Sequence, residues 1–335
     1  MFNVTPRLPA LAVACGLAAC SGPTAGGQAL PPAAQSLAQA LGQSARAAFP
    51  GIAPVRVFTS NRDGGNVLGF DISDSGDVSP AIDIAGPNTQ LSDPDSLAID
   101  AHGDLYAAND GGEEVFVFGK NAHGNVKPIR IIGGSKSHLG PTEGLFVDPK
   151  GDLWVSDYGN DAVTEYAPGA HGNVAPVDTI SGNATHLDSP TGMAMNASGR
   201  LYVANAHGGS VTVYAAGAHG DTGPVATIAG NKTGLEQPFA LAFARNGRLL
   251  VADEASGIAI FAPGAHGNVA PVAKITGLDY PAGVMVDGHD HIWVSEFSGN
   301  AIDEYPSNAN GNATPIKRIA GPNTLLDGSA FLVKN

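Results

Sequence analysis

The chain has 335 residues, of which 31 are Asp or Glu and 17 are Lys or Arg, so its formal net charge is −14. This acidity argues against nucleic acid as a partner and against adhesion to an anionic membrane surface through charge, and it is compatible with a cationic, neutral or metal-ion partner. The 45 Gly and 24 Pro are typical of a chain that turns every few residues.

The first twenty residues have the pattern of a secretion signal. Arg7 supplies one positive charge, and the apolar stretch over residues 8–17 is too short to span a membrane. Residues 17–20, Leu-Ala-Ala-Cys, resemble the bacterial lipobox, in which the cysteine becomes the lipid-modified first residue. We therefore expect a lipoprotein signal peptide over residues 1–19 and a lipid on Cys20. An ordinary signal peptide with incidental cysteines is the alternative.

Residues 20–50 are rich in Ala, Pro, Gly, Gln and Ser and predict a flexible tether. With Cys20 lipidated, the protein would sit in the bacterial cell envelope and contact the membrane through its lipid anchor only. Ser21 after the cysteine favours the outer membrane if the host is Gram-negative.

The remainder of the chain repeats itself. Similar five-residue runs begin 48 residues apart at Val57, Leu105, Leu153, Leu201 and Leu249, and a sixth begins at Ile292. Each repeat holds four short β-rich runs separated by turns, and none shows a sustained 3.6-residue apolar period. Six repeats of four strands predict an all-β, six-bladed β-propeller over residues 51–335.

The chain ends predict how the ring closes. The first repeat lacks an initial strand, and the last repeat is followed by one extra strand at about residues 329–334. We expect this strand to pair with residues 54–59 and to complete the first blade, which leaves no open edge.

The pattern Pro-x-Gly-Leu-Ala-x-Asp-x-x-Gly-x-Leu-Tyr-Val-Ala-Asn, followed by Val-x-Val-Tyr, resembles the NHL-type repeat of six-bladed propellers. The variant with Gly-Ala-His-Gly-Asn-Val-Ala-Pro-Val is similar to repeats of secreted bacterial propeller proteins. The resemblance covers about residues 54–335 and implies the fold rather than a function.

One polar residue per repeat follows the second strand, and Asn109 and Asp157 belong to this set. Such regular spacing is what a turn-capping residue shows, because Asn and Asp side chains accept nearby backbone N–H groups. Asp95 and Glu143 differ, because their equivalents in other repeats are Thr, Phe and Ala. In the propeller these two carboxylates would share the mouth of the central channel with Asn109 and Asp157.

Oxygen ligands that converge in this way offer a weak calcium site centred on Asp95 and Glu143, and calcium is the one cofactor that the sequence suggests. Solvated charge at the rim is the simpler interpretation. The histidines of the repeated Gly-Ala-His-Gly-Asn segments fall on different blades at the periphery and cannot form a metal site together. The dense segment 287–291, Asp-Gly-His-Asp-His, is expected to be a turn between two strands.

The sequence contains no complete catalytic motif, so we expect a binding or scaffold module that presents its channel mouth to a protein, a glycan or a small molecule. Tyr158, Phe239 and Phe297 would add apolar contact beside the carboxylates. An enzyme similar to metal-dependent lactonases and gluconolactonases, or to virginiamycin B lyase, is the alternative. A purely structural envelope protein is a third hypothesis.

Overall fold

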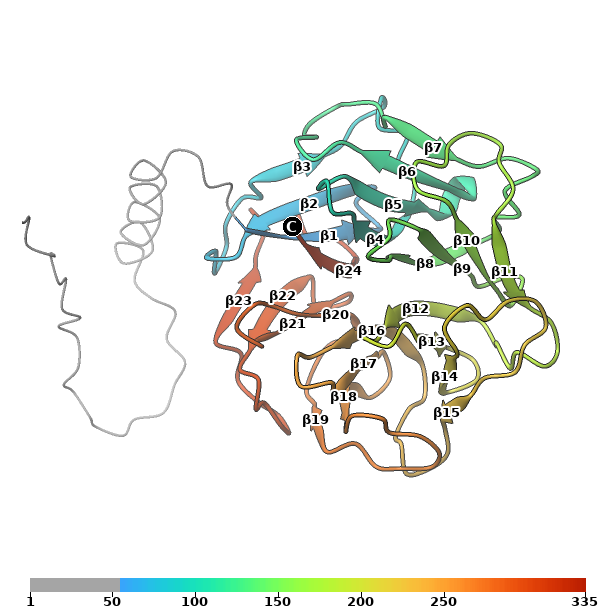
Figure 1. The fold of residues 1–335 in the computed structure, drawn as a ribbon. Helices are drawn as coiled ribbons and strands as arrows, with labels where there is room; N and C mark the ends of the chain where they lie inside the picture. The colour runs from blue at the N-terminus through green and yellow to red at the C-terminus, as the bar shows by residue number, and fades with distance from the viewer. Residues whose placement is uncertain (1–54) are drawn as a thin grey trace, which may run out of the picture. The chain divides into compact units, whose positions relative to one another are not determined.

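The computed structural model describes residues 55–335, which form six antiparallel four-stranded sheets around a central axis, each sheet being one blade of a β-propeller (Figure 1). The predicted all-β, six-bladed fold is thus confirmed. The expected signal peptide (1–19), tether (20–50) and lipid site (Cys20) lie outside the described residues and stay predictions. Within the described part, η1 (Asp110–Gly112) is the only helical element, and no helix is long and apolar enough to cross a membrane.

Blades two to six run in chain order from the inner to the outer strand. Blades two and three consist of β4 (Pro94–Ile99), β5 (Leu105–Asn109), β6 (Glu114–Phe118) and β7 (Arg130–Ile132), then β8 (Thr142–Val147), β9 (Leu153–Asp157), β10 (Ala162–Tyr166) and β11 (Asp178–Ser181). Blades four and five consist of β12 (Pro190–Met195), β13 (Leu201–Asn205), β14 (Ser210–Tyr214) and β15 (Ala226–Ile228), then β16 (Pro238–Phe243), β17 (Leu249–Asp253), β18 (Gly257–Phe261) and β19 (Ala273–Ile275). Blade six consists of β20 (Pro281–Val286), β21 (Ile292–Glu296), β22 (Ala301–Tyr305) and β23 (Lys317–Ala320).

Blade one joins the two ends of the ring. Its strands are β24 (Ser329–Lys334), β1 (Arg56–Asn61), β2 (Asn66–Asp71) and β3 (Ile82–Ile84), in that order from the axis outward. β24 is antiparallel to β1, with Val57 opposite Lys334 and Asn61 opposite Ser329. The prediction that residues 329–334 close the ring is confirmed, and the partner segment begins two residues later than the sequence suggested.

Apolar residues hold the blades face to face. The second strands of blades two to six are buried along their whole length, because a neighbouring blade covers each of their faces. One cluster, for example, joins Trp154 and Val163 of blade three to Met193 and Val203 of blade four. Burial of this apolar surface is the main force that keeps the blades together.

The inner strands approach each other closely where glycine occurs. A Cβ atom on Gly144 would lie 2.1 Å from the carbonyl oxygen of Thr191, and one on Gly192 would lie 2.4 Å from that of Phe239. Glycine at this position of the inner strand is therefore required by the packing of adjacent inner strands.

The repeated Gly-Ala-His-Gly-Asn segment clasps the preceding blade. The backbone N–H of Gly172 donates to the carbonyl of Ile131 at 2.6 Å, and the Asn173 side chain accepts the backbone N–H of Lys136 at 2.6 Å. His171 in the same segment is exposed to solvent. An equivalent clasp joins blade one to blade six, where Gly76 donates to Arg318 and Asp77 accepts from Asn323. The motif is thus structural, as its spacing around the ring predicted.

Candidate functional site

The first strand of each blade carries a register shift near its start, which is the mark of a β-bulge. The second residue of these strands lies in the bulge, namely Asp95, Glu143, Thr191, Phe239, Ala282 and Ala330. These positions thus lie inside the first strand and not in the turn before it. The bulge breaks the alternation of the strand and brings this position to the channel mouth.

The polar ring after the second strands caps turns. In each blade its side chain accepts the backbone N–H of the loop before the first strand: Asn109 from Ser92 at 2.6 Å, and Asp157 from Gly140 at 2.9 Å. Asn205, Asp253, Glu296 and Asn61 do the same. Asn109 and Asp157 are therefore structural, and neither lines the cavity described next, although the sequence included both among the candidate ligand residues.

A cavity of about 300 Å³ occupies the channel mouth, and all six blades contribute to its wall. Five candidates from the sequence line it together: Asp95, Glu143, Tyr158, Phe239 and Phe297. The other polar and aromatic residues of the wall are Arg62, His207, Gln237, Glu254, Tyr280 and Ser298. Its size and its mixture of aromatic and charged groups are typical of a small-molecule site.

The charged part of this wall, which we call the mouth cluster, consists of Arg62, Asp95, Glu143, Glu254 and the adjacent Asp110. Arg62 bridges from blade one to blade two, with Nη1 3.2 Å from Asp95 Oδ1 and Nη2 3.6 Å from Asp110 Oδ2. One cation thus faces several carboxyl groups in a largely buried space.

Asp95 and Glu143 form a carboxyl pair inside the mouth cluster. Asp95 is only 1% exposed, and in the fully ionised pair Asp95 Oδ2 and Glu143 Oε2 are buried without a hydrogen-bond donor. Burial raises the pKa of Asp95 well above its usual range, and the Glu143 carboxylate raises this pKa further against the lowering effect of Arg62. Burial raises the pKa of Glu143 as well, again opposed by Arg62. A proton on either group would supply the missing donor.

Glu254 is the third carboxyl group at the cavity. Burial raises its pKa to about 7, although a hydrogen bond from Tyr280 lowers it, and Glu143 adds repulsion. Tyr280 has a backbone φ of +58°, which its equivalents Asp93, Ser189 and Gly328 share, but it is the aromatic member of this set and its side chain is 39% exposed. A bulky aromatic residue in this left-handed conformation is strained, and such strain occurs most often at functional sites.

Aromatic rings form the remaining walls. Tyr280 lies 5.8 Å from Phe297 between ring centroids, and Phe239 lies 5.1 Å from Phe331 at the inner strands. Across the cavity, the hydroxyl of Tyr158 is 2.9 Å from Nε2 of His207, while Nδ1 of His207 is 2.9 Å from Oγ of Ser189. Both ring nitrogens of His207 are thus engaged, which fixes this wall.

The expected calcium site is already occupied by the guanidinium group of Arg62. Oxygens of Asp95, Asp110 and Glu143 do lie within 4.8 Å of one another, but Arg62 already pairs with two of these carboxylates. Neither Asn109 nor Asp157 belongs to the group. As they stand, the residues hold an internal cation and do not fit a calcium ion.

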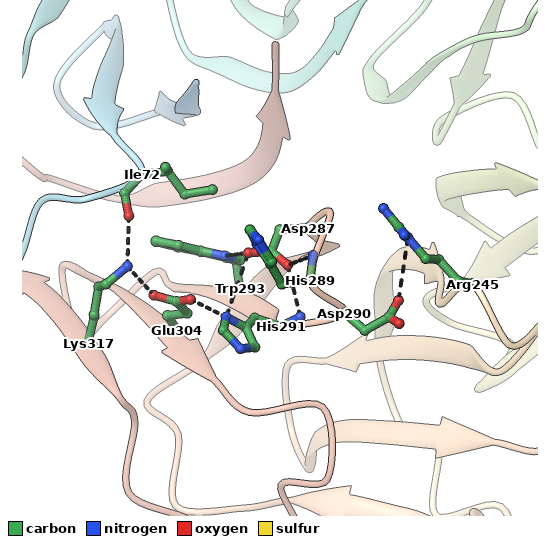
Figure 2. A network of polar contacts seen from close by, with 9 residues as sticks. All are labelled: Ile72, Arg245, Asp287, His289, Asp290, His291, Trp293, Glu304 and Lys317. Atoms are coloured by element: carbon green, nitrogen blue, oxygen red, sulfur yellow. Dashed lines mark hydrogen bonds and ion pairs between the residues drawn. The ribbon is translucent and has the colours of Figure 1, made fainter. Parts of the chain in front are cut away.

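A second group of potential metal ligands lies at the opposite end of the strands in blade six. This blade-six network consists of Asp287, His291, Trp293, Glu304 and Lys317 (Figure 2). Nδ1 of His291 is 2.5 Å from Glu304 Oε1, and Lys317 Nζ is 2.7 Å from Glu304 Oε2. Lys317 also donates to the carbonyl of Ile72 in blade one at 2.8 Å.

Asp287 completes this network. One of its oxygens accepts the backbone N–H groups of His289 and His291, and the other accepts the indole N–H of Trp293. Burial alone would raise the pKa of Asp287, but these hydrogen bonds lower it below its usual value. Asp287 is fully hydrogen-bonded and Glu304 is ion-paired with His291 and Lys317, so the network stabilises a turn, as the sequence predicted for segment 287–291.

The sequence missed Gln237 and Tyr280, which precede the first strands of blades five and six. Arg62, His207 and Glu254 follow the polar ring by one or two residues, at positions that vary from repeat to repeat. Comparison of the repeats could have found Tyr280, because the equivalent positions in other blades hold Asp93, Ser189 and Gly328. No aromatic residue is needed there to make the turn.

No protein-family model matches the chain, and no curated protein matches its sequence. Solved structures match by fold. A chain of a nidogen/laminin complex has a TM-score of 0.61 and 14% identity, covering 84% of this chain and 98% of that chain. A protein of unknown function from Bacteroides caccae has a TM-score of 0.58 and 10% identity, with coverage of 84% and 99%. Virginiamycin B lyase from Staphylococcus aureus has a TM-score of 0.49 and 14% identity, with coverage of 69% and 71%.

At these identities the likenesses show the propeller fold alone, and the similarity to the lyase supports no activity. The NHL-type and lipoprotein features stay predictions from the sequence.

Proposed function

We propose that the protein is a binding module that takes a small organic molecule into the channel-mouth cavity. The observation that carries this proposal is that all six blades contribute to one cavity of about 300 Å³. The repeat consensus requires neither the carboxylates nor most of the aromatic groups found there. Their placement costs stability, because buried carboxyl groups with raised pKa values and a strained tyrosine are unfavourable.

A blocked cavity tests this function. Ser298 lines the mouth and is exposed, so Ser298→Trp obstructs the opening without burying a new polar group. Ala175→Trp, at an exposed position on the periphery, is the matched control. A thermal-shift screen of cationic, neutral and anionic fragments should give ligands that stabilise the wild type and Ala175→Trp but not Ser298→Trp. Absence of hits, or hits that ignore Ser298→Trp, would overturn the proposal and favour a protein partner or a structural role.

Catalysis is the second candidate, favoured by the pKa of about 7 for Glu254 beside the hydroxyl of Tyr280. A carboxyl group with such a pKa can exchange a proton near neutral pH. The test is a panel of lactones and esters with and without calcium. Turnover that Glu254→Gln or Glu143→Gln abolishes, but Ala175→Trp does not, would replace binding by catalysis, and a calcium requirement would support the lactonase-like alternative.

We further propose that the module is lipid-anchored at Cys20 in the bacterial cell envelope, on the strength of residues 17–20. A lipid anchor would leave the propeller outside the cytoplasm with its mouth free to meet solutes. Cys20→Ala should release the protein from the membrane fraction or leave it as an unprocessed precursor. An unmodified mature N-terminus at another residue, found by mass spectrometry, would show that this expectation is wrong.

A further inference from the structure

We propose that the ligand of the channel-mouth cavity is an organic ammonium ion, whose charge faces Glu254 and whose apolar body packs on the aromatic walls. This inference rests on the small-molecule function proposed above. It is argued from the charge balance of the mouth cluster, the position of its carboxyl groups and the chemistry of the opposing rings.

The charge balance of the mouth cluster is negative. Arg62 is the only arginine or lysine among the described residues of the wall, and it is already paired with Asp95 and Asp110. Glu143 and Glu254 remain, and a proton on the Asp95–Glu143 pair would remove only one charge. A cation is therefore attracted to this cavity, while an anion meets repulsion that Arg62 cannot offset.

Glu254 is the accessible partner for that cation. The free oxygens of Asp95 and Glu143 are fully covered, whereas Glu254 is partly open to the cavity. An ammonium group donates N–H bonds to this carboxylate, and Glu143, whose charge acts on Glu254, adds a long-range attraction. A charge-assisted bond of this kind in a partly dehydrated site is stronger than one between neutral groups.

The aromatic groups favour an organic cation over a metal ion. Tyr158, Phe239, Tyr280 and Phe297 present rings rather than oxygen ligands, and the rings attract an organic cation through their π-electrons. They also cover an apolar body. Calcium requires six to eight converging oxygen ligands, whereas only three carboxyl groups lie within 4.8 Å of one another here and two of them are paired with Arg62.

Binding should also release protons. Tyr280, Glu143, Asp253 and Arg62 are the titratable or charged groups that act on Glu254, and with them its pKa is about 7. A bound ammonium ion favours the ionised form of Glu254, so ammonium binding at pH 7 should expel part of a proton.

The experiment compares three probes of similar size by calorimetry: 2-phenylethylamine, 2-phenylethanol and 3-phenylpropionate. The amine should bind about tenfold or more tightly than the alcohol, and the carboxylate most weakly. Repeating the amine titration at pH 7 in buffers of different ionisation enthalpy should show proton release. Glu254→Gln should weaken the amine about tenfold, leave the alcohol unchanged and abolish proton release. Glu165→Gln, outside the cavity, should change none of these values.

Tighter binding of the alcohol or of the carboxylate, or an equal effect of Glu254→Gln on amine and alcohol, would overturn the ammonium class while leaving the small-molecule function intact. Displacement of the amine by calcium in the wild type would overturn it in favour of a metal site. Failure of all three probes would overturn the class if the fragment screen had found other ligands, and would overturn both proposals if it had found none.

Discussion

The mouth cluster and the blade-six network are built from the same kinds of residue at opposite ends of the strands, and they use them in opposite ways. In the blade-six network both oxygens of Asp287 accept hydrogen bonds and its pKa is lowered, while Glu304 forms ion pairs with His291 and Lys317 (Figure 2). In the mouth cluster, Asp95, Glu143 and Glu254 have raised pKa values, and two buried oxygens lack a donor when ionised. The first arrangement stabilises the fold, whereas buried carboxyl groups with raised pKa values beside a cavity are candidates for ligand binding.

The largest expected effect is a loss of stability when the blade-six network is broken. Glu304→Gln removes the charge that pairs with both His291 and Lys317, so the free energy of unfolding should fall by about 2 kcal/mol at pH 7. Urea denaturation measures this change. Glu165→Gln is the matched control, because Glu165 occupies the same strand position in blade three and forms no ion pair among the described residues. Equal losses in both variants would contradict the role given to this network.

The mouth cluster should make the folded state less stable as the pH rises. Carboxyl groups with raised pKa values keep protons in the folded state that the unfolded chain has already released above about pH 4.5. Protonation of Glu254, whose pKa is about 7, contributes fully to the free energy of unfolding at low pH. This contribution is lost as the pH rises to about 7. Each such group contributes a slope of up to about 1.4 kcal/mol per pH unit.

Urea denaturation at fixed salt between pH 5 and 8 measures this slope. Glu254→Gln should make it shallower, and the remainder should include Asp303, whose pKa burial also raises to about 7. A wild-type stability that increases with pH over this range would be incompatible with the raised pKa values of the mouth cluster.

Arg62→Met removes the cation of the mouth cluster and should change stability in a pH-dependent way. At pH 8 the loss of this guanidinium leaves Asp95 and Asp110 without their cation, and the free energy of unfolding should fall by about 1 kcal/mol. At pH 5 the loss should be smaller, because the carboxyl groups of the mouth cluster are then more protonated. Arg245→Met is the control, since Arg245 forms only a distant pair with Asp290, 3.9 Å away at an exposed site. A loss that grows as the pH falls would be the contrary result.

Much of this contrast could be predicted from the sequence, because departures from a repeat stand out. Asp95 and Glu143 were recognised since other blades hold Thr, Phe or Ala at the same position, and the structure brings both to the cavity with Tyr158, Phe239 and Phe297. The six-bladed ring and its closing strand followed from the period and from the matching chain ends.

The rest depends on tertiary contacts that spacing does not reveal. Asn109 and Asp157 recur regularly along the sequence. Only the hydrogen bonds that they accept from Ser92 and Gly140 show that their side chains cap turns and do not line the cavity. The pairing of Arg62 with Asp95 crosses from one blade to the next. Tyr280 occupies a left-handed position that Asp93, Ser189 and Gly328 hold in other blades, and only the structure shows that its side chain lines the cavity.

The most direct test of the central claim is Glu254→Gln, measured for both stability and binding at pH 8. A neutral amide removes a buried charge that the folded protein tolerates poorly, so the free energy of unfolding should rise by about 1 kcal/mol while affinity for 2-phenylethylamine falls. This opposition between stability and binding is the signature of a group retained for its ligand. A variant that is less stable than the wild type and binds the amine equally well would contradict the account, because Glu254 would then be a structural residue like Glu304.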